Sequence, residues 1–222
     1  MVTGITVDEL WARFPCLYHM AQLGSWPSIQ EHGLLSTSAL LDLFELSGHE
    51  RFRIESCHRP ESIPIVHPKH GRAVIRDQKP MSDRSLRRAL IGGLKPADWY
   101  RELNSRVFFW LTEERLNTLM NARAYRRQRH TVLVVDTKLL VERHERRIML
   151  CPMNSGCTIP FPHKRDLKTF RRIAEYPYPD RKWNRDPIVE LAVDYGVPDI
   201  CHFVTEVREA GAGQGIKIVW KR

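Results

Sequence analysis

The sequence predicts a single α+β domain over residues 1–222. Short runs rich in β-branched and aromatic residues recur along the chain, and stretches with apolar side chains at helical spacing separate them. A chain of 222 residues fits one large domain or two small ones and buries a substantial core. We favour one domain, and the chain shows no internal repeat and no low-complexity tract.

The expected elements alternate along the chain. An amphipathic helix over residues 7–14 ends at Pro15, because proline does not continue a helix. A short apolar strand over Leu17–Ala21 comes next. Further helices are predicted at residues 38–46, 83–90, 95–103, 113–122 and 166–174. Further strands are predicted at residues 106–111, 131–135, 148–150, 188–195, 200–207 and 216–220, with a hairpin turn at 211–215.

Residues 49–80 are predicted to be irregular, apart from the apolar stretch Ala73-Val74-Ile75. Such a long irregular connection in a compact domain is more often functional than idle. Arg72 and Arg76 flank the apolar stretch. This pattern has two equally good interpretations, a loop that contacts the substrate and a surface strand with polar ends.

Basic residues are concentrated in two windows. The net charge is +9 and the pI is about 9.6, and residues 123–147 and 163–185 each hold eight Lys or Arg against three Asp or Glu. This clustering favours a nucleic-acid partner, because each phosphate that a basic side chain neutralises releases a counterion. A solvated surface that only aids solubility is the alternative. The candidate contacts are Arg72, Arg76, Arg126, Arg127 and Arg129.

The chain has no sign of export or of membrane insertion. Its five cysteines are scattered without a framework spacing, so we expect free thiols. No apolar run approaches the roughly 20 residues that cross a bilayer, and the first ten residues lack the pattern of a signal peptide. We therefore expect a cytoplasmic protein that does not associate with a membrane.

One motif gives the strongest functional signal. Tyr18-His19-Met20-Ala21 lies on a predicted strand, and a short helix follows it. Ser25 is the expected N-cap of that helix, Pro27 fits its first turn, and Gly33 supplies the left-handed conformation that ends it. The motif therefore holds a histidine at a fixed place beside a rigid turn.

This arrangement, YH followed by SWPSIQEHGLLS, resembles the opening of the ADP-ribosyltransferase superfamily. It is most similar to the bacterial DarT-like toxins and the RNA 2′-phosphotransferases. The resemblance implies a split mixed β-sheet with flanking helices, and NAD as the substrate. It also implies that His19 grips the NAD ribose, with Tyr18 and Met20 beside it in the cofactor site. Where the family has Gly-Thr after the histidine, this chain has Met20-Ala21.

Ser36 has two interpretations. It directly follows Gly33-Leu34-Leu35, where it reaches the adenosine side of the cofactor, or it caps the helix that starts near residue 38. We prefer the cap.

Glu190 is the second candidate site residue. The period of two along a strand places Glu190 on one face with Ile188, Ala192 and Asp194. Taken alone, this pattern fits an edge-strand glutamate that faces water. However, the segment Glu190–Val193 is similar to the strand that bears the catalytic glutamate of the superfamily, and the resemblance implies that role.

Aromatic residues precede a predicted helix between these two points. The resemblance implies that Phe109 or Trp110 stacks on the nicotinamide ring and that Arg115 contacts the cofactor phosphates. Phe108 is expected in the core, and Trp110 fits the core and a ligand platform equally well. His19, Trp110 and Glu190 follow one another in the order of the family.

These residue types suit the implied reaction. Breaking the bond between nicotinamide and ribose develops positive charge on the sugar, and hydrogen bonds to its 2′-hydroxyl strengthen as that charge grows. Glu190 would accept from this hydroxyl and take the proton of the incoming nucleophile, and His19 would orient the ribose.

We therefore expect a mono-ADP-ribosyltransferase that modifies DNA or RNA. The resemblance further implies that the protein acts as a toxin or defence effector and that its partner is an antitoxin or a hydrolase that reverses the modification. NAD glycohydrolysis, RNA 2′-phosphotransfer and a catalytically silent nucleic-acid-binding domain stay open as alternatives. Possible zinc donors such as Cys57, His58, His67 and His70 match no standard zinc spacing, so we expect no bound metal.

Overall fold

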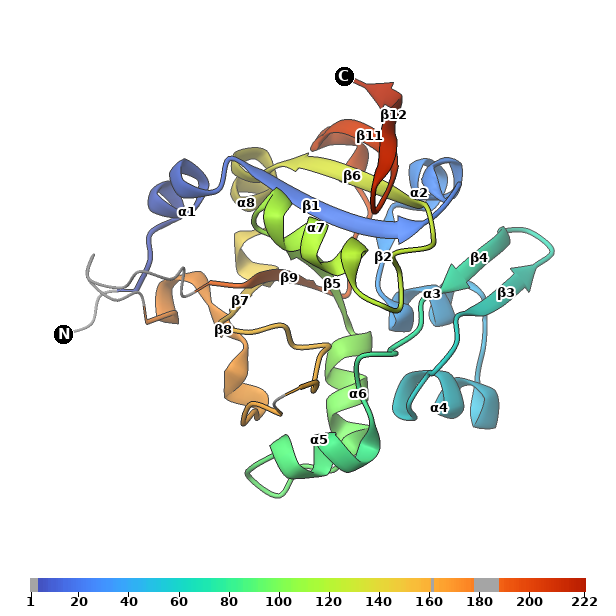
Figure 1. Ribbon diagram of the computed structural model, residues 1–222, viewed down its shortest axis with the longest axis vertical. Coiled ribbons are helices and arrows are strands. Elements are labelled where there is room, and N and C mark those ends of the chain that lie inside the picture. Colours follow the sequence, from blue (N-terminus) through green and yellow to red (C-terminus); the bar gives the residue numbers. More distant parts are fainter. Residues whose placement is uncertain (1–3, 161, 178–187) are drawn as a thin grey trace.

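Helices lie on both sides of a large sheet (Figure 1). The structure, a computed structural model, describes residues 4–160, 162–177 and 188–222. The α-helices in these ranges are α1 (Val7–Arg13), α2 (Trp26–His32), α3 (Thr37–Leu43), α4 (Gly48–Ser56), α5 (Asp83–Ala89), α6 (Pro96–Asn104), α7 (Glu113–Asn121) and α8 (Thr137–His144). The 3-10 turns are η1 (Glu145–Arg147), η2 (Leu167–Thr169), η3 (Ile173–Glu175) and η4 (Ile200–His202).

Eight strands form the main sheet, in the order β12-β11-β6-β1-β5-β9-β7-β8. These strands are β1 (Cys16–Gln22), β5 (Arg106–Trp110), β6 (His130–Asp136), β7 (Ile148–Cys151), β8 (Arg171–Arg172), β9 (Glu190–Asp194), β11 (Val204–Gly211) and β12 (Gln214–Lys221). Two small sheets pair β2 (Leu34–Leu35) with β10 (Gly196–Val197), and β3 (Ile63–His67) with β4 (Gly71–Ile75). The fold is therefore α+β, as the sequence predicts.

Every strand pair in the described residues is antiparallel. The expectation of a mixed sheet is therefore wrong for this part of the chain. Parallel neighbours need a crossover that returns the chain to the same end of the sheet, and here each neighbour enters from the opposite end. The hairpin expected at 211–215 is present, because β11 and β12 pair directly through Gly211↔Gln214.

The main sheet is divided between its two central strands. β1 pairs with β6 along its whole length and β5 pairs with β9 from Arg106 to Trp110, but β1 and β5 meet only at Tyr18↔Trp110. Next to this contact, the His19 Nδ1 and the Phe108 carbonyl oxygen lie 2.8 Å apart in a hydrogen bond. The sheet therefore consists of two halves, β12-β11-β6-β1 and β5-β9-β7-β8.

The largest apolar core lies on one face of both halves. It joins Leu10 of α1, Ile29 of α2 and Leu140 of α8 to strand residues such as Leu133 and Phe109. On the opposite face lies α7 (Figure 1). Its Leu116 and Met120 pack against Val132 of β6. β6 is therefore covered on both faces, which explains why its sequence is apolar without interruption.

Two further groups of helices form separate apolar clusters. α5 and α6 pack Leu86, Trp99 and Leu103 against Cys151 of β7 and Ala192 of β9. α3 and α4 pack against the β3–β4 hairpin through a separate cluster that contains Leu41, Ile54, Ile65 and Ile75.

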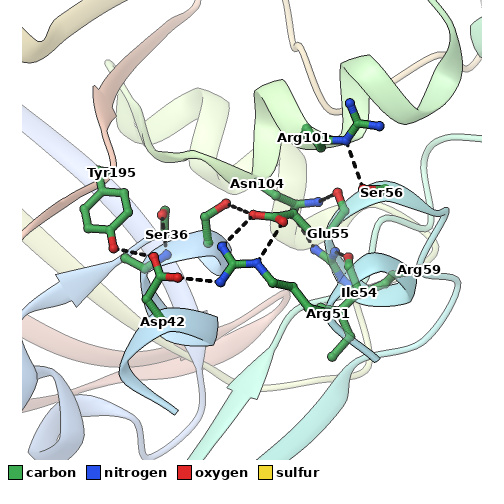
Figure 2. A network of polar contacts seen from close by, with 12 residues as sticks. Ser36, Asp42, Arg51, Ile54, Glu55, Ser56, Arg59, Arg101, Asn104 and Tyr195 are labelled. Atoms are coloured by element: carbon green, nitrogen blue, oxygen red, sulfur yellow. Dashed lines mark hydrogen bonds and ion pairs between the residues drawn. The ribbon is translucent and has the colours of Figure 1, made fainter. Parts of the chain in front are cut away.

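A polar network ties α3 and α4 to the end of β9 (Figure 2). The Tyr195 hydroxyl donates to Asp42, and Arg51 bonds both Asp42 and Glu55. Tyr195 adopts a left-handed φ of 67°, which is uncommon for a residue with a side chain. Its backbone N–H donates to Ser105 at 2.7 Å, and its carbonyl accepts from Ser36 at 3.1 Å. These bonds on both sides of Tyr195 hold the unusual conformation in place.

Several predicted elements differ from the structure. Residues 166–174 were expected to form a helix, but they form η2, β8 and the start of η3, because Arg171–Arg172 extends to pair with β7. Residues 49–80 are not irregular throughout: they include most of α4 and the β3–β4 hairpin. α4 has a weak pattern in the sequence because only Ile54 and Ser56 are buried. The strand expected at 200–207 begins only at Val204, after η4.

The ends of α2 agree only in part with the prediction. Ser25 has helical backbone angles and its side chain makes no cap hydrogen bond, so the expectation that it caps α2 is wrong. Gly33 does end α2, with φ of +82°. A Cβ at Gly33 would also lie 2.4 Å from the Pro198 Cα, so both conformation and space require glycine there.

All five cysteines are free, as the sequence predicts. Within the described ranges, no helix combines the length and apolar character needed to cross a bilayer. Residues 178–187 lie outside the described ranges, and with them the end of the second basic window, 163–185. The strand expected at 188–195 is present as β9, which begins at Glu190.

Candidate active site

A cavity of about 650 Å³ lies where β1 and β5 separate. This volume falls in the range of small-molecule sites. The sequence-predicted residues in its wall are His19, Met20, Ser36, Arg72, Arg76, Phe109, Trp110 and Glu190. The predicted residues outside the wall are Tyr18, Arg115, Arg126, Arg127 and Arg129. Candidates from four parts of the chain thus meet around one cavity.

His19 presents one defined tautomer. A carbonyl oxygen only accepts, so the Nδ1 that bonds to the Phe108 carbonyl carries the proton. Burial lowers the pKa of His19 to about 4, with the charge of Arg76 acting in the same direction. The ring is therefore neutral at pH 7, and its Nε2 is an acceptor that makes no hydrogen bond within the described part of the chain.

Glu190 begins β9 in the interior of the sheet. It pairs with Trp110 on one side and with Cys151 on the other, so the interpretation as a water-facing edge residue is wrong. Its side chain is buried, and its Oε2 accepts from the Ser155 N–H at 3.1 Å and from the Ser155 hydroxyl at 2.6 Å. In the described residues, its Oε1 accepts no hydrogen bond.

Burial raises the pKa of Glu190 to about 7. The two bonds from Ser155 oppose this rise, and so do the charges of Arg165 and Arg115. A buried carboxyl that titrates near neutrality and borders a cavity is characteristic of acid–base and electrostatic catalysis. The arrangement thus provides two residues with acceptor atoms, Glu190 and His19, in the lining of one cavity.

The aromatic residues of β5 point to opposite faces. Phe109 is only 1% exposed and belongs to the main core, although it touches the cavity wall and lies 5.7 Å from the His19 ring, centroid to centroid. Trp110 is partly buried on the other face, over Leu116 and Met120 of α7. Because Phe109 is committed to the core, Trp110 is the more accessible of the two residues expected to stack on the nicotinamide ring.

Phe108 was expected in the core, and the structure places it between core and cavity. It is partly buried against the α5–α6 cluster, and it also lines the cavity.

The smaller predicted contacts divide between wall and scaffold. Ser36 caps α3, since its hydroxyl accepts from the Ala39 N–H at 3.2 Å, which confirms the preferred interpretation. Ser36 also lines the cavity. Tyr18 and Met20 lie on the same face of β1 and both pack against the α7 cluster, but only Met20 lines the cavity.

Arg76 stands in the wall and forms no ion pair within the described residues, although the negative charge of Asp77 acts on it. Its Nη1 lies 3.4 Å from the Nδ1 of His130, and its guanidinium lies over the Tyr125 ring at 5.4 Å. Burial lowers the pKa of His130 to about 4, so this partner is neutral. By contrast, Arg106 in the same wall pairs with acidic residues. Arg72, on β4, is exposed at the wall.

The other predicted arginines do not line the cavity. Arg126 and Arg127 are exposed in the turn that follows α7, next to Tyr125, which lines the wall. Arg129 bonds the Glu209 carbonyl at 2.8 Å and so serves the β11–β12 hairpin. Arg115 lies on α7, from where its charge lowers the pKa of Glu190.

Sequence reasoning missed Ser155, Trp99 and Arg165. Ser155 is buried and bonds Glu190, and its own carbonyl accepts from the Trp99 Nε1 and from the Arg165 Nη1. Ser155 lies in a loop of Asn, Ser and Gly that is typical of a turn, and no local pattern distinguishes it. The described residues contain no group of three or more His, Cys, Asp or Glu placed to hold a metal ion.

The buried titratable groups predict a pH dependence of stability. His19 and His130 have pKa values lowered to about 4 by burial, so the unfolded chain binds protons first as the pH falls below about 6.5. The free energy of unfolding therefore decreases between pH 6.5 and 4 because of these two histidines. Glu190, raised to about 7, acts with the opposite sign, because the folded state binds its proton first.

Thermal unfolding of wild type and Glu190→Gln between pH 4 and 8 tests this balance. We expect the variant to be more stable than wild type at pH 8 by about 3 kcal/mol, since one pKa unit corresponds to 1.36 kcal/mol. On acidification, its melting temperature should fall more steeply, because the opposing group is gone. Parallel curves for the two proteins would contradict the raised pKa of Glu190.

The fold and the cavity define an α+β protein with a divided antiparallel sheet and a ligand-sized site between its halves. A family model matches residues 15–204, and the chain belongs to this family, described as a family of unknown function (DUF7002). The matched range runs from just before β1 to the start of β11 and includes all the site residues above. Searches of curated proteins and of solved structures return no match.

Proposed function

We propose that this protein is an NAD-dependent mono-ADP-ribosyltransferase that modifies DNA or RNA. The observation that supports it most is that His19, Trp110 and Glu190 line the same cavity although they lie far apart in the chain. The resemblance assigns these three residues to one dinucleotide. A structure with the three in separate places would have removed the basis for the proposal.

The residues around the cavity suit the reaction. The bond between the nicotinamide nitrogen and the ribose C1′ breaks, and its electron pair leaves with nicotinamide. The Glu190 Oε1 accepts from the ribose 2′-hydroxyl and offsets the positive charge on the sugar. The neutral His19 Nε2 accepts from a ribose hydroxyl, and Trp110 stacks on the departing ring. A nucleophile of the acceptor then bonds to C1′ and passes its proton to Glu190.

Basic residues near the cavity support a nucleic-acid acceptor. Arg72 and Arg76 belong to the wall, and Arg126 and Arg127 follow Tyr125 of that wall. The two parts are in contact, because the Tyr125 hydroxyl donates to Asp77 at 2.8 Å. A toxin or defence effector in the cytoplasm, with an antitoxin or reversing hydrolase, would fit such an activity.

Arg76 favours one second candidate function, the transfer of an RNA 2′-phosphate to NAD. A guanidinium that is held by neutral partners keeps its charge for a phosphate of the ligand. This reaction also consumes NAD, so the two functions differ in the acceptor that they require.

Incubation with NAD labelled in its adenylate part tests the proposal. Single-stranded DNA, RNA, RNA with an internal 2′-phosphate, and a protein mixture serve as acceptors in parallel. Label retained on DNA or unmodified RNA supports ADP-ribosylation, and dephosphorylation of the 2′-phosphate RNA supports the second candidate. Release of nicotinamide without an acceptor indicates hydrolysis, and unchanged NAD in every reaction would overturn the proposal.

The exposed arginines after α7 are expected to bind the acceptor backbone. Replacing Arg126 and Arg127 together with Gln should weaken the binding of single-stranded DNA several-fold, without regard to sequence. The slope of log affinity against log salt should become shallower by about 0.7 per lost phosphate contact. Fluorescence anisotropy at several salt concentrations measures both effects. The double variant Arg84→Gln and Arg88→Gln on α5 removes the same charge from another exposed surface, and an equal effect there would contradict a local contact.

A further inference from the structure

The two oxygens of Glu190 have different surroundings. Oε2 accepts from both the N–H and the hydroxyl of Ser155, whereas Oε1 accepts nothing in the described residues. Two donors from one residue fix the rotation of the carboxylate as well as its position. Ser155 therefore decides which oxygen is available to the cavity, whose wall contains both residues.

Ser155 is itself held from behind. Its carbonyl accepts from the Arg165 Nη1 at 2.8 Å and from the Trp99 Nε1 at 3.3 Å. Arg165 also donates to the Cys157 carbonyl at 2.9 Å and to the His163 carbonyl at 3.1 Å. One guanidinium thus ties three carbonyls of the same loop, and the planar fork of arginine permits this geometry.

Arg165 is anchored to a second part of the fold. Its backbone N–H donates to the Ala89 carbonyl at 3.0 Å, and its own carbonyl accepts from the Ile91 N–H at 3.1 Å. The connection therefore runs from the end of α5 through Arg165 and Ser155 to the carboxylate of Glu190. Trp99 completes it, because its ring lies 5.6 Å from the Arg165 guanidinium carbon.

The burial of Arg165 is hard to explain by stability alone. Its side chain is 1% exposed and forms no ion pair within the described ranges. Burial lowers the pKa of its guanidinium, which reflects the cost of removing the charge from water. Buried charged interactions are often replaced by apolar packing without loss of stability, so a geometric role is the better explanation.

We propose that Ser155 and Arg165 are a positioning pair, in which Arg165 fixes the loop and Ser155 turns the Oε1 of Glu190 toward the cavity. The pair does not touch the reacting atoms. It acts through Glu190, by setting the orientation of the carboxylate and by favouring its ionised form. The consequence for catalysis rests on the proposed function, whereas the effect on Glu190 is independent of any substrate.

Ser155→Ala tests the first link. The variant keeps the backbone donor and loses the hydroxyl, so the ionised form of Glu190 loses one of its two hydrogen bonds. We expect the proton affinity of Glu190 to rise about ten-fold, which is the size of one hydrogen bond to a charged group. Carbon-13 NMR titration of glutamate carboxyls measures it, and the signal missing from Glu190→Gln identifies the residue.

Two variants serve as controls for this titration. Ser155→Thr retains a hydroxyl and should restore the wild-type value. Thr6→Ala also removes a bonded hydroxyl, but from the N-cap of α1, and it should leave Glu190 unchanged. An unaltered titration in Ser155→Ala, or an equal change in Thr6→Ala, would overturn the proposal.

Arg165→Lys and Arg165→Met test the second link. Neither replacement can bond three carbonyls, so both should raise the proton affinity of Glu190 and speed hydrogen exchange of the Ser155 and Cys157 amides. If a folded variant leaves both readouts unchanged, Arg165 has no positioning role. If neither variant folds, the titration of Ser155→Ala still decides the role of Ser155. Trp99→Phe then replaces the arginine variants, because it removes the other hydrogen bond to the Ser155 carbonyl. A change in the Glu190 titration in Trp99→Phe would show that holding this carbonyl matters for Glu190, and an unchanged titration would show that it does not.

NAD consumption separates this proposal from the function. In Ser155→Ala, the acidic limb of the pH profile should move to a ten-fold lower proton concentration. A shifted Glu190 titration in a protein that never consumes NAD would leave the positioning pair intact and refute the proposed function. If the protein consumes NAD but the Glu190 titration is unshifted in Ser155→Ala, the proposed function would stand and the positioning pair would be refuted.

Discussion

Replacing Glu190 with Gln is expected to reduce NAD consumption by about 10²- to 10³-fold, because the variant loses an electrostatic stabiliser of the transition state. The glutamine oxygen still accepts the two Ser155 bonds, so the loop should stay in place. A neutral amide neither offsets the charge on the sugar nor takes a proton. The affinity for NAD should change little, since the lost interaction strengthens mainly in the transition state.

Nicotinamide release in the presence of acceptor measures the rate, and calorimetry measures NAD affinity. Glu175→Gln is a matched control, because it makes the same chemical change at an exposed position. Wild-type rates in Glu190→Gln would show that the carboxylate has no part in the reaction. A loss of NAD binding equal to the loss of rate would show that Glu190 holds the ground state and does not act on the transition state.

Phe109→Ala is expected to lower the free energy of unfolding by about 3–5 kcal/mol, the usual cost of truncating a buried phenylalanine. Phe109 is 1% exposed and lies in the main core with residues of both halves of the sheet. Truncation leaves a cavity there, because the packed strands around it relax only in part. Trp110→Ala should cost less stability, since Trp110 is only partly buried, and should mainly weaken NAD binding.

Urea unfolding at 25 °C and calorimetric titration with NAD distinguish the two roles. Phe52→Ala is the control for stability, because Phe52 is 52% exposed and should tolerate truncation. If Phe109→Ala kept its stability but lost NAD affinity, the stacking role would pass from Trp110 to Phe109. If Trp110→Ala bound NAD as wild type does, the assignment of Trp110 to the nicotinamide ring would be wrong.

The elements with strong local patterns could be predicted from the sequence. β1, β5 and β6 are runs of apolar, β-branched and aromatic residues, and the structure confirms a strand at each. Residues 166–174 misled the prediction, since Phe170 and Ile173 have helical spacing but are buried in separate clusters. Tertiary contacts decided that segment, because pairing with β7 satisfies its backbone better than an isolated helical turn would.

The candidate site divides in the same way. His19, Trp110 and Glu190 could be selected because each lies in a segment with a recognisable pattern. Ser155, Trp99 and Arg165 could not, since their contacts join parts of the chain that are far apart, such as Arg165 and Ala89. Ser155 lies in a loop of polar residues and glycine, and this composition is equally typical of a solvated turn.

The strands β1, β5 and β6, the basic character and the choice of Glu190 and His19 as candidates followed from the amino acids alone, because local patterns and charge are properties of short segments. Only the tertiary structure decided that the sheet divides beside His19 and that Glu190 is buried in its interior. The protonation of Glu190 and the tautomer of His19 depend on that placement. The physical reason is that a pKa and a hydrogen-bond direction are set by the atoms that surround a group in space.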